Sequence, residues 1–163
     1  MYDILALDLA TQLGWAHSSG ESGTVSFHLT RGDSPGIRFL KFRKWLIETL
    51  ERLPSGLLVY EQAGSHRSNA ATHVAHGLIS QAEVVASEFE IEITSKSPSE
   101  IKKFMLPKIP AKQRTKIRMI QAAENAWPFV DILDDNQADA LCLLEVVAAD
   151  LGVCLKAAKE REC

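Results

Sequence analysis

The chain has 163 residues, of which 46% are hydrophobic and 24% are charged, and its formal net charge is −3. This length and composition favour one soluble globular domain with a real hydrophobic core. No apolar run approaches the roughly 20 residues of a membrane span, and a net acidic chain is a poor general polyanion binder. Three cysteines without a CxxC pair argue against a disulfide framework or a zinc knuckle. Because the sequence starts without the basic region of a secretion signal, we expect a cytoplasmic protein with no membrane partner.

The first third of the chain predicts an antiparallel β-meander followed by a helix. Residues 2–10 are expected to form a buried strand, and turn residues separate two further strands at 13–18 and 23–29. Hydrophobic side chains then recur at helical spacing from residue 39 to residue 53, and Pro54 ends this helix.

The remainder alternates short strands with helices. Strands are predicted at residues 56–61 and 91–94. Four helices are predicted: one at 69–89, one that begins at Pro98, one that ends at Trp127 and one at 136–151. Ser97 and Glu100 have the spacing of a capping box, with Pro98 at the first helical position. We therefore predict one α/β domain over residues 1–155 and a charged tail at 156–163. Its mixed five-stranded sheet combines a three-strand antiparallel meander with parallel strands, flanked by helices.

Several acidic side chains are placed where a metal site needs them. Asp8 interrupts the first apolar strand, and its burial costs several kcal/mol unless a partner such as a cation compensates the charge. Glu61 ends a strand at the carboxyl edge of the sheet, where α/β folds place ligand sites. In the last helix Asp135 and Asn136 precede Asp139 by four and three residues, so either pair shares a face. Oxygen ligands from separate elements suit hard divalent ions, and two such ions could promote phosphodiester cleavage.

Each acidic residue also has a structural explanation when it is taken alone. Asp134 or Asp135 could cap the last helix, Glu61 could be a surface acid, and Asp8 could be a buried structural aspartate. The combination favours the metal site over these separate explanations.

A basic segment lies between residues 96 and 118, where only Glu100 is acidic. Its basic residues are Lys96, Lys102, Lys103, Lys108, Lys112, Arg114, Lys116 and Arg118. Such a segment on a mildly acidic protein is either a phosphate-binding face or a solvated helix face.

Four segments resemble, in order, the motifs of the RuvC-type Holliday junction resolvases of the RNase H-like superfamily, and of the phage-type RuvC-like branch in particular. They are LALDLATQLGWA, LLVYEQAG, ITSKSPSEIKKF and DDNQADALCLL. The resemblance covers residues 4 to about 150. It implies an RNase H-like fold and a Mg²⁺-dependent endonuclease that resolves four-way DNA junctions by paired symmetric nicks. Two Mg²⁺ ions per site, replaceable by Mn²⁺, and a homodimer in a bacterial or phage-infected cell are further implications.

The resemblance also implies roles for individual residues. Asp8, Glu61 and Asp139 correspond to metal-binding catalytic carboxylates. The family's fourth carboxylate usually lies three residues before the last, where this chain has Asn136, so either Asn136 or the adjacent Asp135 completes the set. We favour Asp135, because an asparagine carbonyl adds no charge.

For DNA contacts, the resemblance implies a lysine near the scissile phosphate. Lys116 occupies that place and Lys112 is the second candidate. The DNA backbones would be held by Arg67, Lys102, Lys103, Lys108, Lys112, Arg114, Lys116 and Arg118. Gly64 stands where bacterial resolvases carry a base-stacking aromatic, and His66 or Arg67 could stack instead.

Three other interpretations remain at this point. The first strand and its turn also resemble the phosphate-binding start of sugar kinases, but those proteins need two such domains. A DNA-structure-binding protein without catalysis is supported mainly by Asn136. A nuclease that cuts branched or flapped DNA with little junction preference is intermediate between the resolvase and this non-catalytic protein. If the protein is a dimer, the small side chains of the helix at 69–89 suggest that helix as its interface.

Overall fold

The computed structural model describes residues 3–63, 68–153 and 155. The described elements are, in chain order, β1 (Ile4–Asp8), β2 (Gln12–His17), β3 (Ser22–Ser26), α1 (Gly36–Arg52), β4 (Leu57–Glu61), α2 (Asn69–Glu88), β5 (Glu92–Lys96), α3 (Pro98–Met105), the short 3₁₀ helix η1 (Ala111–Gln113), α4 (Lys116–Ala126) and α5 (Asp135–Asp150). The predicted tail at 156–163 lies outside the described residues, so the proposed domain division stays a prediction.

The strands form one mixed sheet in the order β3-β2-β1-β4-β5. β1 pairs antiparallel with β2, and β2 pairs antiparallel with β3, which makes the predicted meander. β4 and β5 are added in parallel on the other side of β1. The predicted fold class is therefore confirmed.

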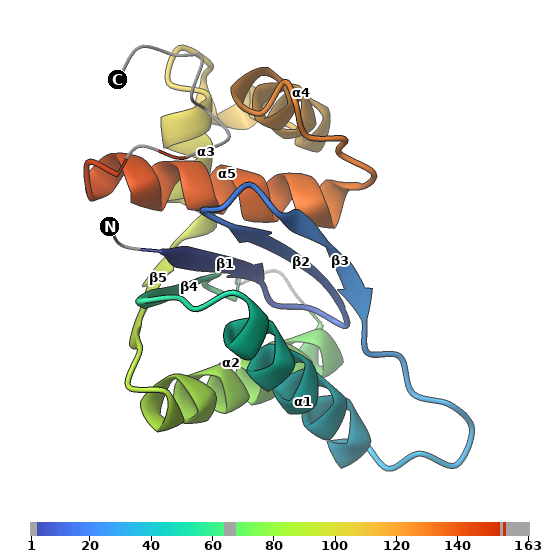
Figure 1. Cartoon of the computed structure of the whole chain (residues 1–163). Helices are drawn as coiled ribbons and strands as arrows, with labels where there is room; N and C mark the ends of the chain where they lie inside the picture. The colour runs from blue at the N-terminus through green and yellow to red at the C-terminus, as the bar shows by residue number, and fades with distance from the viewer. Residues whose placement is uncertain (1–2, 64–67, 154, 156–163) are drawn as a thin grey trace.

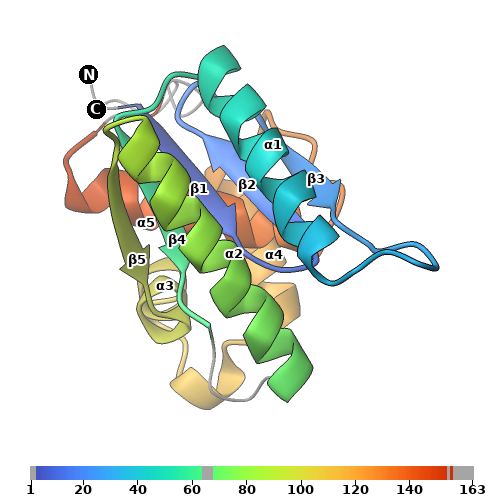
Figure 2. The ribbon, with the colours of Figure 1, turned by 90° about the horizontal axis from the view of Figure 1, so that it is seen from below.

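Helices cover both faces of this sheet (Figure 1 and Figure 2). α1 and α2 lie on one face and α5 lies on the other, with α3 and α4 packed beyond it (Figure 1). Alternate side chains of β1 supply the two cores: Leu5 and Leu7 face α1 and α2, whereas Ile4 and Ala6 face α5. A strand buried on both faces needs an unbroken apolar sequence, which explains the hydrophobic start of the chain.

Two boundaries differ from the sequence-based prediction. β1 ends at Asp8 and not at residue 10, so Asp8 closes the strand instead of lying in its middle. The apolar pattern predicted a longer strand because Leu9 lies outside β1 but is still buried in the core beside α1 and α2. The predicted basic loop after α3 contains the 3₁₀ turn η1. The capping box at Ser97 and Glu100 is confirmed, with both of its hydrogen bonds formed.

The small side chains of α2 serve the interior more than an interface. Ala75 is buried, and a Cβ placed on Gly77 would lie 2.3 Å from Cε1 of Phe39 on α1. These two small residues therefore let α1 pack closely on α2, and the expectation of a dimer interface on this helix stays a prediction. Ala70 and Ala71 are exposed. Within residues 3–63 and 68–153, no helix combines the length and apolar character that crossing a membrane requires.

Candidate active site

Two of the predicted carboxylates end neighbouring strands. β1 and β4 are parallel and in register up to the pair Leu7 and Tyr60. Asp8 and Glu61 are the next residues along, and each is the last of its strand. Asp8 is only 8% exposed, and Glu61 is half-buried. The topology thus places both acids at the same edge of the sheet, where the sequence predicted Glu61 but not Asp8, which it placed within its strand.

Gly14 brings the start of α5 onto this edge. It is the partner of Asp8 on β2, and a Cβ placed on it would lie 1.8 Å from the backbone oxygen of Asn136. Any side chain here would collide with backbone, which cannot move aside cheaply. Glycine at this position is therefore required for α5 to rest on the sheet beside Asp8.

Hydrogen bonds to β3 hold the same end of α5. The carboxylate of Asp134 accepts from the backbone nitrogen of Gln137 at 2.8 Å and from the Thr24 hydroxyl at 2.7 Å. The buried Gln137 side chain accepts from the nitrogen of Leu133 and donates to the Ser22 hydroxyl, each at 2.9 Å. Asp134 is therefore the helix cap, which leaves Asp135 available for another partner. Sequence reasoning missed Gln137, although a glutamine on an inward-facing helix position is itself a signal of a buried polar network.

Asp139, one turn further along α5, reaches a cavity of about 200 Å³. Glu61, Lys102 and Lys116 also line it. Two carboxylates and two lysines from four different elements therefore converge on one space. Burial raises the pKa of Asp139, and the charges of Lys116 and Lys102 oppose that rise in part.

The remaining members of the predicted ligand set lie around this cavity. Asp135 forms an ion pair with Lys116, which links the starts of α4 and α5. Among the described residues, the cavity lining includes neither Asp8, Asp135 nor Asn136. The choice between Asp135 and Asn136 as fourth ligand stays a prediction.

The donor set fits a hard cation held by few protein ligands. In the part of the chain that the structure describes, no three or more His, Cys, Asp or Glu side chains gather closely enough to hold a metal. Mg²⁺ commonly uses only one or two carboxylates and completes its shell with water and phosphate oxygens. Glu61 and Asp139 provide such a pair, and Lys102 and Lys116 provide positive charge for an anionic ligand.

The acids of this region also act on Cys142, which lies on the same helix as Asp139. Cys142 is fully buried on α5, and burial together with the negative charges of Asp139, Glu145 and Glu61 raises its pKa to about 12. Its thiol therefore stays protonated and is no ligand for Mg²⁺. Glu145, which the motif search did not select, adds to the negative potential.

The predicted DNA-binding residues fall into different groups. Lys102 and Lys116 line the cavity, whereas Lys103, Lys108 and Lys112 are exposed farther out. The remaining basic residues of the segment are braced by other groups. Arg114 donates to the backbone oxygen of Ile109 at 2.8 Å, Arg118 contacts Gln113 at 3.5 Å, and Lys96 pairs with Asp150 at 2.7 Å. The expectations for Gly64, His66 and Arg67 lie outside the described residues.

Asp139→Asn is expected to stabilise the metal-free protein at neutral pH. Because the pKa of Asp139 is raised above its ordinary 3.8, ionisation is less favourable in the folded than in the unfolded chain. The unfolded chain then ionises first, so stability falls as the pH rises from 3.8 through the raised pKa. In EDTA, the melting temperature of the variant should rise relative to that of the wild type as the pH increases through this range. The exposed Asp131→Asn is the control, and a variant less stable than wild type at neutral pH would contradict the prediction.

No protein-family model and no curated protein matches the sequence. Solved structures do match the fold. The chain resembles RuvC of Thermus thermophilus in complex with a Holliday junction substrate (TM-score 0.74, 16% identity), over 93% of this chain and 97% of that one. A second Thermus thermophilus RuvC structure matches with a TM-score of 0.72 and 14% identity over the same shares of both chains.

The yeast mitochondrial Holliday junction resolvase matches with a TM-score of 0.64 and 12% identity, over 88% of this chain and 76% of that one. These matches share the five-stranded mixed sheet and its flanking helices. The chain therefore has the fold of the RuvC-type Holliday junction resolvases.

Proposed function

We propose that this protein is a Mg²⁺-dependent endonuclease that resolves four-way DNA junctions by paired symmetric nicks. The observation that carries the proposal is the cavity where Glu61 and Asp139 meet between Lys102 and Lys116. The comparisons support the proposal because the structure of one protein with the same fold contains a Holliday junction substrate. The same proposal assigns the protein to the phage-type RuvC-like branch, whose motifs the sequence resembles.

In this mechanism Glu61 and Asp139, which line the cavity, would hold Mg²⁺. Asp8, which ends the strand beside Glu61, and Asp135 or Asn136 would add the further oxygen ligands that the resemblance implies. When bound, the ions would supply Lewis-acid activation of water and phosphate. Lys116 and Lys102 present positive charge to the scissile phosphate, where negative charge accumulates in the transition state. The ion pair with Asp135 orients Lys116 at the start of α4. The products carry a 5′-phosphate and a 3′-hydroxyl.

Two symmetric nicks require two active sites, so a homodimer with two-fold symmetry belongs to the proposal. The exposed lysines between α3 and α4 would hold the DNA backbones on either side of each cut. Binding should then weaken steeply as salt increases, because each phosphate contact releases a counterion.

Lys116→Met is expected to slow cleavage about 10²- to 10³-fold while junction binding changes little. The reason is that Lys116 lines the cavity and acts on charge that develops during the reaction. Single-turnover cleavage and binding of the same junction measure the two effects separately. Lys44→Met, which removes an exposed lysine of α1 that does not line the cavity, is the matched control. Equal losses of binding and cleavage in Lys116→Met would mean that this lysine only tethers DNA.

The central experiment is cleavage of a synthetic immobile four-way junction by the purified protein. Duplex, flap and three-way substrates are the controls, each with Mg²⁺, Mn²⁺ or EDTA. Paired symmetric nicks confined to the four-way junction are the expected result. Equal cutting of flaps and junctions would indicate a broader branch nuclease. Tight junction binding without cutting in either metal would contradict the proposed endonuclease activity. It would support a junction-binding protein without catalysis, the alternative that Asn136 favours.

A further inference from the structure

The segment between β3 and α1, residues 27–35, projects from the body of the protein (Figure 1 and Figure 2). We call it the basic arm. It leaves the sheet at the edge that carries Asp8, because β3 runs antiparallel to β2 and therefore in the direction of β1. Its first residue is anchored there, since the backbone nitrogen of Phe27 donates to the oxygen of Thr11 at 2.8 Å in the turn after β1.

The tip of the basic arm is an ordered turn. The nitrogen of Asp33 donates to the oxygen of Thr30 at 3.0 Å, and the carboxylate of Asp33 accepts from both the nitrogen and the hydroxyl of Thr30 at 2.9 Å. Gly32 has φ of 98°, the conformation that a type II turn requires at its third position. Arg31 is the exposed second residue of this turn. The exposed Arg31 side chain therefore belongs to a preformed turn.

Hydrogen bonds from α1 fasten the base of the basic arm. Nε of Arg38 donates to the oxygen of Phe27 at 3.2 Å, and Nζ of Lys41 donates to the oxygen of His28 at 3.3 Å. Lys41 also lies 3.4 Å from the carboxylate of Asp33. These bonds hold the loop in place before any ligand binds, which reduces the entropy lost on binding.

Positive charge is concentrated at this end of α1. Residues 27–41 contain three basic residues, Arg31, Arg38 and Lys41, and one acidic residue, Asp33, which pairs with Lys41. Farther along α1 the basic residues are matched by acids: Arg43 pairs with Glu88 at 2.7 Å and Lys44 pairs with Glu48 at 3.8 Å. The excess positive charge therefore lies next to the edge that carries Asp8 and Glu61.

The basic arm lies on the opposite side of the sheet from the lysines of α3 and α4 (Figure 1). The two basic regions therefore flank the candidate active site from opposite sides. We propose that the basic arm binds the sugar-phosphate backbone of a DNA duplex leaving the active site on the β3 side, with Arg31 contacting a phosphate. This inference rests on the proposed function and adds a second DNA-binding surface to it.

The length of the basic arm sets where that contact falls. Arg31 lies four residues beyond Phe27, so its backbone reaches at most about 14 Å from the sheet. B-form DNA advances about 3.4 Å per base pair, so this reach corresponds to about four base pairs. The contacted phosphates should therefore lie within about four base pairs of the point where the duplex passes the end of β3.

The test compares Arg31→Ala with wild type by fluorescence anisotropy on a four-way junction, in EDTA over a series of salt concentrations. We expect several-fold weaker binding, and a slope of log affinity against log salt that is smaller by about 0.9, the value for one lost phosphate contact. Arg31→Lys, which keeps the charge, should restore most of the slope.

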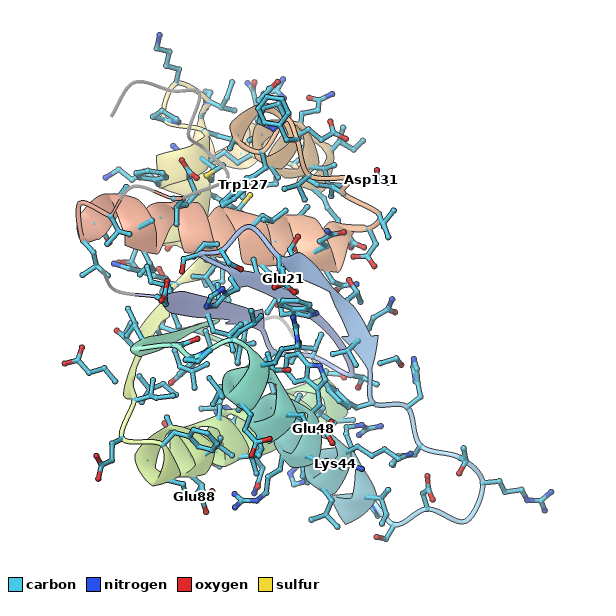
Figure 3. The ribbon with its side chains drawn as sticks, in the orientation of Figure 1. Glu21, Lys44, Glu48, Glu88, Trp127 and Asp131 are labelled. Carbon is cyan, nitrogen blue, oxygen red and sulfur yellow. The ribbon has the colours of Figure 1, made fainter. Side chains whose placement is uncertain are left out.

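Lys44→Ala is the matched control, because it removes an exposed charge from α1, the helix that follows the basic arm (Figure 3). Its salt slope should equal that of the wild type. If Arg31→Ala also leaves affinity and salt slope unchanged while the wild type cuts junctions, DNA binding by the basic arm is disproved. The proposed nuclease function is then unaffected. If the slope depends on Arg31 but the wild type never cuts, the nuclease fails and the second binding surface remains.

Discussion

Replacing Asp8 by asparagine is expected to slow junction cleavage about 10³-fold or more, because metal-assisted charge stabilisation is worth several kcal/mol and about 1.4 kcal/mol corresponds to each factor of ten. Asp8 ends β1 beside Glu61 and is almost fully buried. Asparagine has nearly the same shape, so the fold should persist while the negative charge that attracts Mg²⁺ is lost. Single-turnover cleavage in Mg²⁺ measures the loss, and anisotropy in EDTA should show junction binding retained.

The matched control for Asp8→Asn is Asp131→Asn. Asp131 is exposed on the loop before α5 (Figure 3), so the same change of charge is made away from the carboxyl edge of the sheet. This variant should cut at the wild-type rate. Wild-type cleavage by Asp8→Asn in Mg²⁺ would contradict the assignment of Asp8 to the catalytic centre, and the buried carboxylate would then be structural.

Gly14→Ala is expected to destabilise the protein by roughly 3 kcal/mol, the upper part of the usual range for overpacking, and to lower the melting temperature by about 10 °C. The new Cβ would lie 1.8 Å from the backbone oxygen of Asn136, so the first turn of α5 must move off the sheet. Asp139 moves with that turn. Since a displacement of about 1 Å can reduce catalysis about 10²-fold, cleavage by the folded fraction should fall as well.

Gly36→Ala controls for the general effect of replacing glycine. Gly36 begins α1, and the nearest atom to a Cβ placed there is the Ser34 hydroxyl oxygen at 3.9 Å, an ordinary contact. Thermal melting and cleavage by this variant should match the wild type or slightly exceed it in stability. If Gly14→Ala melts and cuts like the wild type, α5 does not depend on close contact with β2.

The sequence alone predicted the elements whose signals are local. An unbroken apolar run predicted β1 as a strand buried on both faces, and Ser97 and Glu100 predicted the start of α3 through their spacing. Glu61 was placed at the carboxyl edge of the sheet because it follows a run of strand residues, whereas Asp8 was expected inside its strand. These predictions needed only side-chain periodicity and capping chemistry, which act over a few residues.

The tertiary structure decided which distant groups meet. Nothing local in Gly14 says that Asn136 will press against it, and nothing local in Asp135 says that Lys116 will be its partner. The first apolar run was also ambiguous at its end, since Leu9 is buried without belonging to β1. In each case the outcome depends on how α4, α5 and the sheet pack together.

The basic arm illustrates the same division. Its sequence marks a turn at Gly32, but the net charge of −3 and the denser basic segment at residues 96–118 draw attention elsewhere. Only the course of β3 places Arg31 at the edge that carries Asp8. Sequence thus determined the strands, the helix start and the candidate acids, because those follow from neighbouring residues. Which acids, lysines and loops share one site was decided by packing, because contacts between residues far apart in the chain exist only once the sheet and its two helical layers have formed.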